Sequence, residues 1–368
     1  IIFVFFFGLI FFCYEIYSKG ESWVFSSVNR HLSHGTSAEG KILDRHGVIL
    51  AQSIDGKRVY NENKAIRTAM LHSVGDGSNL IATSAQNIYA ASLFGYNILT
   101  GLGTPDVLKM SKDVTLTLDS TLCGKISSCF KNKKGTAIAY NYLTGEMLCM
   151  VSLPTYDVQQ KPNSKMLSEE SYEGVYLNRA ISSSYTPGSV FKIFTSAAAL
   201  DLIQGVEKRA FNCNKIKLVE GEKVTCMSKH GNISLKDALC KSCDIAFCDI
   251  ALELGKEKMT QKLEEFGFNK QLYFNGIKLA QSKYSVSDAT PGDLGWSGIG
   301  QYTNTLNPIH MLKIMGAIAN EGTCVEPYFV KSVCSESSEI EDENKAEVKT
   351  TSYLTVETAN KIKEWMRY

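Results

Sequence analysis

The stretch Ser184-Tyr-Thr-Pro-Gly-Ser189-Val-Phe-Lys192 decides the fold of this chain. The alanine-rich, apolar run over residues 189–203 predicts a buried helix, and side chains three residues apart lie on one helix face. Pro187-Gly188 turns the chain into this helix and leaves Ser189 in its first turn, where free N–H groups favour developing negative charge. Burial disfavours the ammonium form of Lys192, so its amine can take the serine proton. The stretch therefore predicts a serine nucleophile with a lysine base.

The local pattern leaves a second interpretation open. Ser-x-x-Lys is weak by itself, because Ser128-Cys-Phe-Lys131 also matches it. That copy precedes the polar run Asn132-Lys-Lys-Gly135 and has no Pro-Gly before it, so we interpret Ser128 as a surface residue. For Ser189 the alternative is a helix-capping serine followed by a solvated lysine.

Short strands and longer helices surround this stretch. Leu143-Thr-Gly145 predicts a hairpin turn between two apolar runs, and Gly255 predicts a break in the longest later helix. We expect strands over residues 40–51 (a pair joined at His46-Gly47), 113–119, 136–141 and 146–152, and helices over residues 244–267, 307–320 and 355–367.

Composition narrows the class of protein. The 368 residues are 44% hydrophobic and 21% charged, which is typical of globular proteins and excludes a disordered, collagen-like or coiled-coil chain. The formal net charge of +1 gives no basic footprint for a nucleic acid, so we expect no nucleic-acid partner. At roughly 100–200 residues per domain, the length predicts two or three domains.

The first residues predict a membrane anchor. Residues 1–13 are apolar throughout and include six phenylalanines, which is too hydrophobic for an ordinary core helix. They are fewer than the ~20 residues that span a bilayer, but the first residue is Ile1 rather than Met, so we expect the natural segment to be longer. A signal-peptide core or a buried helix is the alternative, although no Ala-x-Ala-like cleavage site follows. We expect an anchor at residues 1–17, a small irregular module at 18–111 and the main domain at 112–368.

The eleven cysteines allow several interpretations. Cys240-x-x-Cys243 has redox or zinc spacing, but no second pair stands at a ligand interval, so we interpret these residues as small hydrophobic side chains on a helix. Cys213 and Cys226 flank a polar loop, and a disulfide between them stays open. His31-x-x-His34 lacks a third ligand. We therefore expect no metal and no cofactor.

Taken in order, these motifs resemble the transpeptidase domain of class B penicillin-binding proteins, in particular the penicillin-binding protein A group. The resemblance covers nearly the whole chain and implies an α+β fold like that of the serine β-lactamases, with an antiparallel sheet packed with helices. It rests on Gly40–Ala51, Val114–Asp119, Gly135–Asp157, Leu177–Lys192, Ser297–Gln301 and Asn307–Gly322.

The resemblance implies two further site residues. The family's Ser-x-Asn motif aligns with Ser242-Cys-Asp244, which implies Ser242 as the proton shuttle and Asp244 as the residue that holds Lys192 and contacts the substrate. This chain has Asp where the family has Asn, and its charge would hold Lys192 as the ammonium and weaken it as a base. The alternative is that both are only helix-start residues. The family's third motif, Lys-Thr-Gly or Lys-Ser-Gly, is absent from the 368 residues, so we expect a chain truncated at both ends.

The resemblance implies a single-pass membrane protein with an extracytoplasmic D,D-transpeptidase domain, in which Ser189, Lys192 and Ser242 are catalytic and Asp244 binds substrate. Its substrates would be peptidoglycan stem peptides ending in D-Ala-D-Ala, with β-lactams as inhibitors and a membrane glycan polymerase as partner. Two alternatives stay open: a carboxypeptidase or class D-like β-lactamase of the same fold, and a binding or sensor module that does not turn over.

Overall fold

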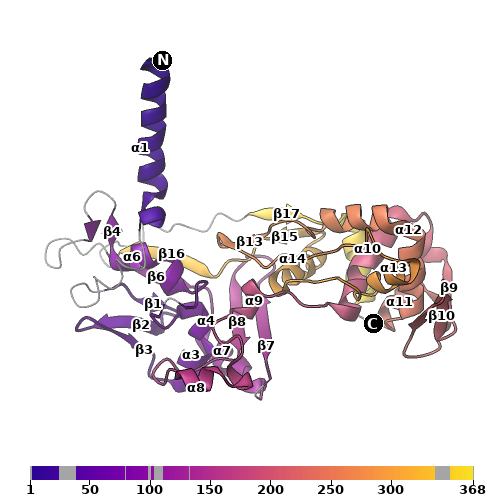
Figure 1. Cartoon of the computed structure of the whole chain (residues 1–368), viewed down its shortest axis with the longest axis horizontal. Helices are drawn as coiled ribbons and strands as arrows, with labels where there is room; N and C mark the ends of the chain where they lie inside the picture. Colours follow the sequence, from indigo (N-terminus) through magenta and orange to yellow (C-terminus); the bar gives the residue numbers. More distant parts are fainter. Residues whose placement is uncertain are drawn as a thin grey trace. The chain divides into compact units, whose positions relative to one another are not determined.

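The computed structural model describes residues 2–24, 39–78, 80–97, 101–102, 111–131, 133–335 and 349–367. The chain forms two compact units, which are described separately (Figure 1). The sheet unit comprises Ile1–Ala139, Glu146–Asn178 and Tyr328–Glu347. The helical unit comprises Tyr140–Gly145, Arg179–Pro327 and Val348–Tyr368. The His31-x-x-His34 pair lies outside the described residues.

The sheet unit is built on a five-stranded sheet in the order β16-β6-β1-β2-β3. Its strands are β1 (Ile42–Leu43), β2 (Ile49–Ile54), β3 (Lys57–Tyr60), β6 (Lys112–Leu116) and β16 (Val330–Ser335). This confirms the predicted strand pair near residues 40–51 and the strand that begins near residue 113. The sheet is mixed, not wholly antiparallel, because β1 pairs with β6 in parallel, with Ile42 opposite Val114.

A hairpin, apart from Tyr140–Gly145 at its turn, and several short helices complete the sheet unit. The predicted hairpin is present as β7 (Gly135–Tyr140) paired with β8 (Met147–Leu153). Gly145 in its turn has a φ of 81°, a left-handed conformation that glycine adopts without a steric penalty. The remaining elements are α3 (Lys64–Ala69), α4 (Leu71–Val74), α5 (Ala85–Ile88), α6 (Ala90–Phe94), β4 (Tyr96–Asn97), β5 (Gly101–Leu102), α7 (Ser120–Cys129), α8 (Ser164–Leu167) and the 3-10 turn η1 (Glu170–Tyr172).

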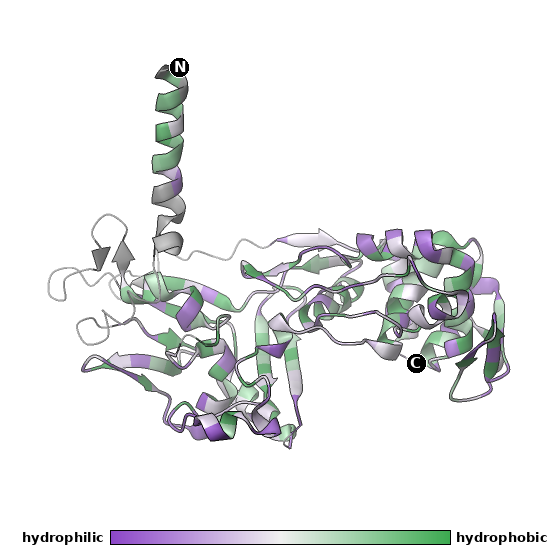
Figure 2. Cartoon of the chain, in the orientation of Figure 1, coloured by the Kyte–Doolittle hydropathy of each residue, from purple (hydrophilic) through white to green (hydrophobic). Residues whose placement is uncertain are grey.

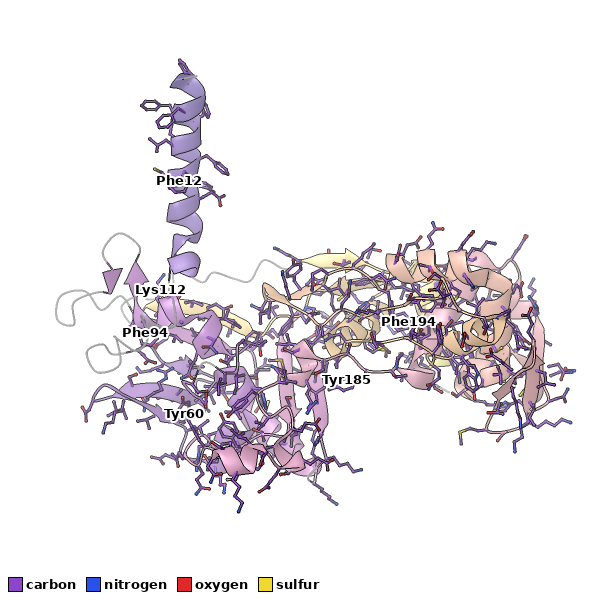
Figure 3. The ribbon with its side chains drawn as sticks, viewed as in Figure 1. Phe12, Tyr60, Phe94, Lys112, Tyr185 and Phe194 are labelled. Carbon is purple, nitrogen blue, oxygen red and sulfur yellow. The ribbon has the colours of Figure 1, made fainter. Side chains whose placement is uncertain are left out.

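Helix α1 (Ile2–Val24) contains the apolar segment that the sequence marks as an anchor. Its start carries hydrophobic residues (Figure 2), and the Phe12 side chain projects from it (Figure 3). Phe3 and Phe7 are 83% and 72% exposed. Within the described residues, no helix combines the length and the apolar character that a bilayer crossing requires.

The helical unit combines packed helices with small two-stranded sheets. Its elements are α9 (Arg179–Ser182), the 3-10 turns η2 (Gly188–Phe191) and η3 (Val206–Lys208), α10 (Lys192–Leu202), β9 (Ala210–Cys213), β10 (Ile216–Val219), β11 (Glu222–Thr225), β12 (Gly231–Ser234), α11 (Leu235–Cys240), α12 (Asp244–Glu265), β13 (Tyr273–Phe274), β14 (Ile277–Lys278), α13 (Pro291–Ser297), α14 (Pro308–Ala319), β15 (Thr323–Val325), β17 (Thr350–Ser352) and α15 (Val356–Trp365). Helices α12, α14 and α15 confirm the three later predicted helices, and Gly255 interrupts α12 as predicted, with a φ of 75°.

Helix α10 lies in the core of the helical unit. Every residue from Lys192 to Ala199 is buried, which confirms the predicted buried helix. Phe194, labelled in Figure 3, packs against Phe266 and Phe268 with ring centroids 5.9 and 5.1 Å away. The helix begins three residues later than predicted, because residues 188–191 form the 3-10 turn η2.

His310 on α14 is a fully buried imidazole that makes the stability of the helical unit depend on pH. Its Nδ1 lies 2.7 Å from Ser282 Oγ and its Nε2 lies 2.8 Å from the Phe266 carbonyl, which accepts the ring N–H. Burial lowers the pKa of His310 from 6.5 to about 4.

We expect the free energy of unfolding to fall as the pH drops from about 6.5 to about 4, since the unfolded chain then binds a proton that folded His310 excludes. The slope would approach about 1.4 kcal/mol per pH unit in this window. His310→Gln keeps one donor and one acceptor without the titration, so urea unfolding at pH 7.5 and pH 5 should show a smaller pH effect in this variant. Equal pH effects in both proteins would contradict the prediction.

Candidate active site

The turn η2 presents Ser189 at the start of α10. The Ser189 side chain is exposed, whereas residues 191–199 are buried. Gly188 begins the turn with a φ of 59°, and its N–H donates to the Gly300 carbonyl at 2.9 Å. A Cβ at Gly300 would overlap the Gly188 carbonyl and Phe191 Cβ, so only glycine fits there. The absence of a side chain at Gly300 therefore allows the turn η2 to lie close to the Gly300 backbone. The sequence did not predict this role.

Lys192 is the first residue of α10, and its side chain is almost entirely buried. Its Nζ lies 3.2 Å from Ser189 Oγ, as the three-residue spacing predicts. The same nitrogen donates to the Ser242 carbonyl at 2.9 Å and to Ser242 Oγ at 2.8 Å. Its third acceptor is Asp244 Oδ1 at 2.6 Å, a charge-assisted contact. The Phe247 ring, with its centroid 5.8 Å away, covers the ammonium group as well.

Ser242 is held by the junction between α11 and α12. Its φ is 53°, in the left-handed region that serine rarely adopts. The Ser242 N–H donates to the Leu239 carbonyl at 3.2 Å, and the Cys243 N–H donates to the Ala238 carbonyl at 2.8 Å. This pair of bonds is a Schellman motif, in which glycine usually occupies the left-handed position. A strained serine at this position turns both its hydroxyl and its carbonyl toward Lys192.

We expect the free energy of unfolding of Ser242→Gly to exceed that of Ser242→Ala by about 1 kcal/mol. Both variants lose the hydroxyl, but only alanine is strained in the left-handed conformation. Lys241, with a φ of −94°, provides the matched control, since alanine should there be the more stable substitution. Urea denaturation of the four variants measures both differences. The same order of stability at the two positions would show that the backbone of Ser242 is unstrained.

Asp244 is the first residue of α12, so its carboxylate lies at the helix end that favours negative charge. The structure thus brings together all four residues that the sequence and its resemblance single out, although Ser242 and Asp244 follow Ser189 by more than 50 residues. Ser128, the other Ser-x-x-Lys serine, is exposed, and its hydroxyl donates to the Lys125 carbonyl at 2.7 Å. This confirms the interpretation of Ser128 as a surface residue.

These four residues form a serine site without histidine. The Ser189 hydroxyl is exposed to a reactant, and an amine touches it from the buried side. A second hydroxyl, that of Ser242, touches the same amine and completes a path for a proton. Such a set can support nucleophilic acyl transfer.

Comparisons with known proteins identify the same fold and family. Residues 135–368, more than half of the chain, match the penicillin binding protein transpeptidase domain. The crystal structure of a D,D-transpeptidase domain from Eggerthella lenta is similar with a TM-score of 0.73 and 24% identity, over 90% of this chain and 81% of that chain. PBPA from Mycobacterium tuberculosis is similar with a TM-score of 0.71 and 23% identity, over the same shares of the two chains.

Curated relatives are similar in sequence at a distance. The peptidoglycan D,D-transpeptidase PbpA of Mycolicibacterium smegmatis is 29% identical over 217 residues, which are 54% of this chain and 43% of the relative. Stage V sporulation protein D of Bacillus subtilis is 26% identical over 329 residues, which are 82% of this chain and 49% of the relative. The chain thus spans less than half the length of these two relatives. By its matched domain, its fold and its assembled serine–lysine site, the chain belongs to the penicillin-binding protein transpeptidase family.

Proposed function

We propose that the protein carrying this chain is a peptidoglycan D,D-transpeptidase that works through an acyl-enzyme on Ser189. One observation carries the proposal: Lys192 Nζ touches both Ser189 Oγ and Ser242 Oγ, at 3.2 and 2.8 Å. The three groups to which the proposal assigns the roles of nucleophile, base and proton shuttle are therefore in contact. The relatives named D,D-transpeptidase support the same reaction.

In the proposed reaction, Ser189 Oγ attacks the carbonyl carbon of the penultimate D-Ala of a stem peptide. Lys192 takes the serine proton, and the proton passes through Ser242 to the amine of the terminal D-Ala as the C–N bond breaks. The Ser189 N–H lies at the start of a helical segment and would donate to the oxyanion. An amine of a second stem peptide then attacks the ester carbonyl, and Ser189 regains its proton. β-Lactams would acylate Ser189 as mimics of the donor.

Penicillin labelling of the full-length protein, followed by peptide mapping, tests this proposal. Trypsin cleavage after Arg179 and Lys192 isolates Ser189, and cleavage after Lys125 and Lys131 isolates Ser128. We expect one covalent adduct, on the peptide of residues 180–192, and none on the peptide of residues 126–131. An adduct on the second peptide, or on neither, would overturn the assignment of Ser189.

Asp244 supports a second candidate function, the capture of a β-lactam or stem peptide without turnover. Its carboxylate accepts a charge-assisted hydrogen bond from Lys192 Nζ at 2.6 Å, and proton transfer through this nitrogen has to rearrange that contact. If the site is a sensor, the acylated protein should persist when an amine acceptor is added. If it is a transpeptidase, the acceptor should release the acyl group as an amide. Asp244→Asn should speed acylation in either case, because a neutral amide forms a weaker hydrogen bond with Lys192 Nζ than the carboxylate does.

We also propose that helix α1 attaches the protein to the cell membrane as a single-pass anchor, with the catalytic domain outside the cytoplasm. The support is the set of exposed phenylalanines on α1, which water solvates poorly. We propose a membrane glycan polymerase as a partner of the protein at the membrane. Cell fractionation should place the full protein in the membrane pellet and a variant lacking residues 1–17 in the soluble fraction. Protease added to spheroplasts should digest the catalytic domain, and protection from it would contradict the proposed orientation.

A further inference from the structure

Three thiols and an imidazole meet in the helical unit. They belong to Cys213, Cys226, His230 and Cys243, and their ligand atoms all lie within 4.8 Å of one another. Cys213 ends β9, Cys226 follows β11, His230 precedes β12 and Cys243 caps α12. Among the residues that the structure describes, this is the one group of three or more potential metal ligands found so close together.

The spacing within the group matches a tetrahedral zinc site. His230 Nδ1 lies 3.5 Å from Cys213 Sγ and 3.5 Å from Cys226 Sγ. Zinc bonds of about 2.3 Å to sulfur and about 2.0 Å to nitrogen, at a tetrahedral angle, place those two atoms about 3.5 Å apart. The imidazole therefore already stands at ligand distance from both sulfurs through one nitrogen.

Burial and chemistry favour a metal over free thiols. Cys213 and Cys243 are 0% exposed and Cys226 is 4% exposed, whereas His230 is half-buried and closes the group toward solvent. None of the three thiols is in a disulfide in this structure, so the Cys213–Cys226 bridge left open by the sequence is not formed. Soft thiolates with one imidazole are a preferred ligand set of zinc.

We propose that Cys213, Cys226, His230 and Cys243 bind a structural Zn²⁺ ion. The three thiols lose their protons to solvent on binding, and neutral His230 coordinates through Nδ1. Four protein ligands fill the tetrahedron and leave no position for a water, so the ion is structural rather than catalytic.

The ion would join parts that are too small to be stable alone. Strands β9 and β12 form one two-stranded sheet, and β10 and β11 form another. Isolated two-stranded sheets are marginally stable in water. A zinc ion shared by both sheets and by the start of α12 would tie them to the helix.

The fourth ligand also connects the ion to the active site, and this part of the inference rests on the proposed function. Cys243 stands between Ser242 and Asp244, and both neighbours contact Lys192 Nζ. A zinc–thiolate bond at Cys243 would therefore fix the strained backbone that aims Ser242. Cys243 is in this sense a positioning residue, because it touches no reacting atom.

The linear spacing explains why this site escapes sequence analysis. The ligands are arranged as Cys-x12-Cys-x3-His-x12-Cys, so only Cys226 and His230 are close in sequence. Cys240, which the Cys-x-x-Cys spacing pairs with Cys243, is not a member. Its thiol is exposed and donates to the Trp365 carbonyl at 3.2 Å. Backbone pairing of Gly231 with Cys213 brings the ligands together.

Metal analysis of the full-length protein, purified without a metal-chelating tag, tests the proposal directly. We expect about one zinc ion per chain by inductively coupled plasma mass spectrometry. After Zn²⁺ is replaced with Co²⁺, we expect the absorption bands of tetrahedral Co²⁺ bound to thiolates. Cys226→Ser and His230→Ala should lose most of the zinc, whereas His230→Cys should keep it. Cys248→Ser, at a buried thiol of α12 outside the group, should bind zinc like the wild type.

Two outcomes would overturn the proposal. One is a wild-type protein without zinc that stays without it after reduction and zinc addition. The other is a purified protein that lacks two hydrogens by intact mass and maps to a Cys213–Cys226 disulfide. Penicillin labelling of the wild-type and zinc-depleted proteins separates the two proposals, and zinc loss should slow acylation of Ser189. Stoichiometric zinc without a Ser189 adduct would overturn only the proposed function, whereas a Ser189 adduct on a protein that binds no zinc would overturn only the zinc site.

Discussion

Replacing Ser189 with alanine is expected to abolish the covalent adduct with penicillin altogether. The substitution removes the one oxygen that Lys192 Nζ can activate at the exposed end of α10. No neighbouring hydroxyl can substitute well for it, because the Ser242 side chain is held by the strained junction before α12. The rate of acylation should fall by a factor of about 10³ or more, to the level of non-specific modification. Intact mass after a timed incubation measures the effect.

Ser128→Ala is the matched control for this experiment. Ser128 has the same Ser-x-x-Lys spacing, but it is exposed on α7 and lies in the sheet unit. The control should acylate at the wild-type rate and unfold at the wild-type temperature. A residual stoichiometric adduct in Ser189→Ala, lost only when Ser128 is also changed, would refute the serine–lysine site.

Lys192→Met is expected to slow acylation and to destabilise the fold. Methionine preserves the apolar stem but removes the nitrogen that contacts Ser189, Ser242 and Asp244. Loss of a positioned base costs about 10²–10⁴ in rate. The Asp244 carboxylate, only 15% exposed, then lacks its cation, which destabilises the fold by about 3–5 kcal/mol. Acylation rates and urea midpoints measure the two effects separately.

Two controls separate the chemistry from the stability. Lys313 is another buried lysine of the helical unit, paired with Glu326 at 2.8 Å. Lys313→Met should therefore destabilise the protein to a similar degree without losing acylation. Adding Asp244→Asn to Lys192→Met should restore part of the stability and none of the activity. Recovery of acylation in this double variant would show that Lys192 acts only by supporting the fold.

The order and type of the main elements were predictable because they depend on local patterns. The hairpin β7–β8 follows from two apolar runs around a glycine turn, and α14 follows from an apolar run after Asn307-Pro308. The start of α10 was misplaced by three residues. Gly188 and Gly300, which are far apart in sequence, hold the chain in a 3-10 turn there, and their contact has no local signature.

Within the site, contacts between residues close in sequence could be predicted, and contacts between distant residues could not. Ser189 and Lys192 could be paired from spacing alone, since one helical turn fixes how their side chains meet. Ser242 and Asp244 came only from the family resemblance, because nothing local says that the start of α12 packs against the start of α10. The metal-ligand group was missed for the same reason: its members lie at or next to the ends of β9, β11, β12 and α12.

The sequence by itself determined the pairing of Ser189 with Lys192, the family resemblance and the apolar character of the first residues. Those features depend on composition and on spacing within a few residues. Within one helix or strand, the backbone geometry fixes where side chains at a given spacing lie. Only the tertiary structure decided that one lysine nitrogen serves Ser189, Ser242 and Asp244 together, and that Cys243 points to Cys213, Cys226 and His230. Both results depend on how strands and helices that are far apart in sequence pack together. In a close-packed interior each contact depends on all the surrounding side chains.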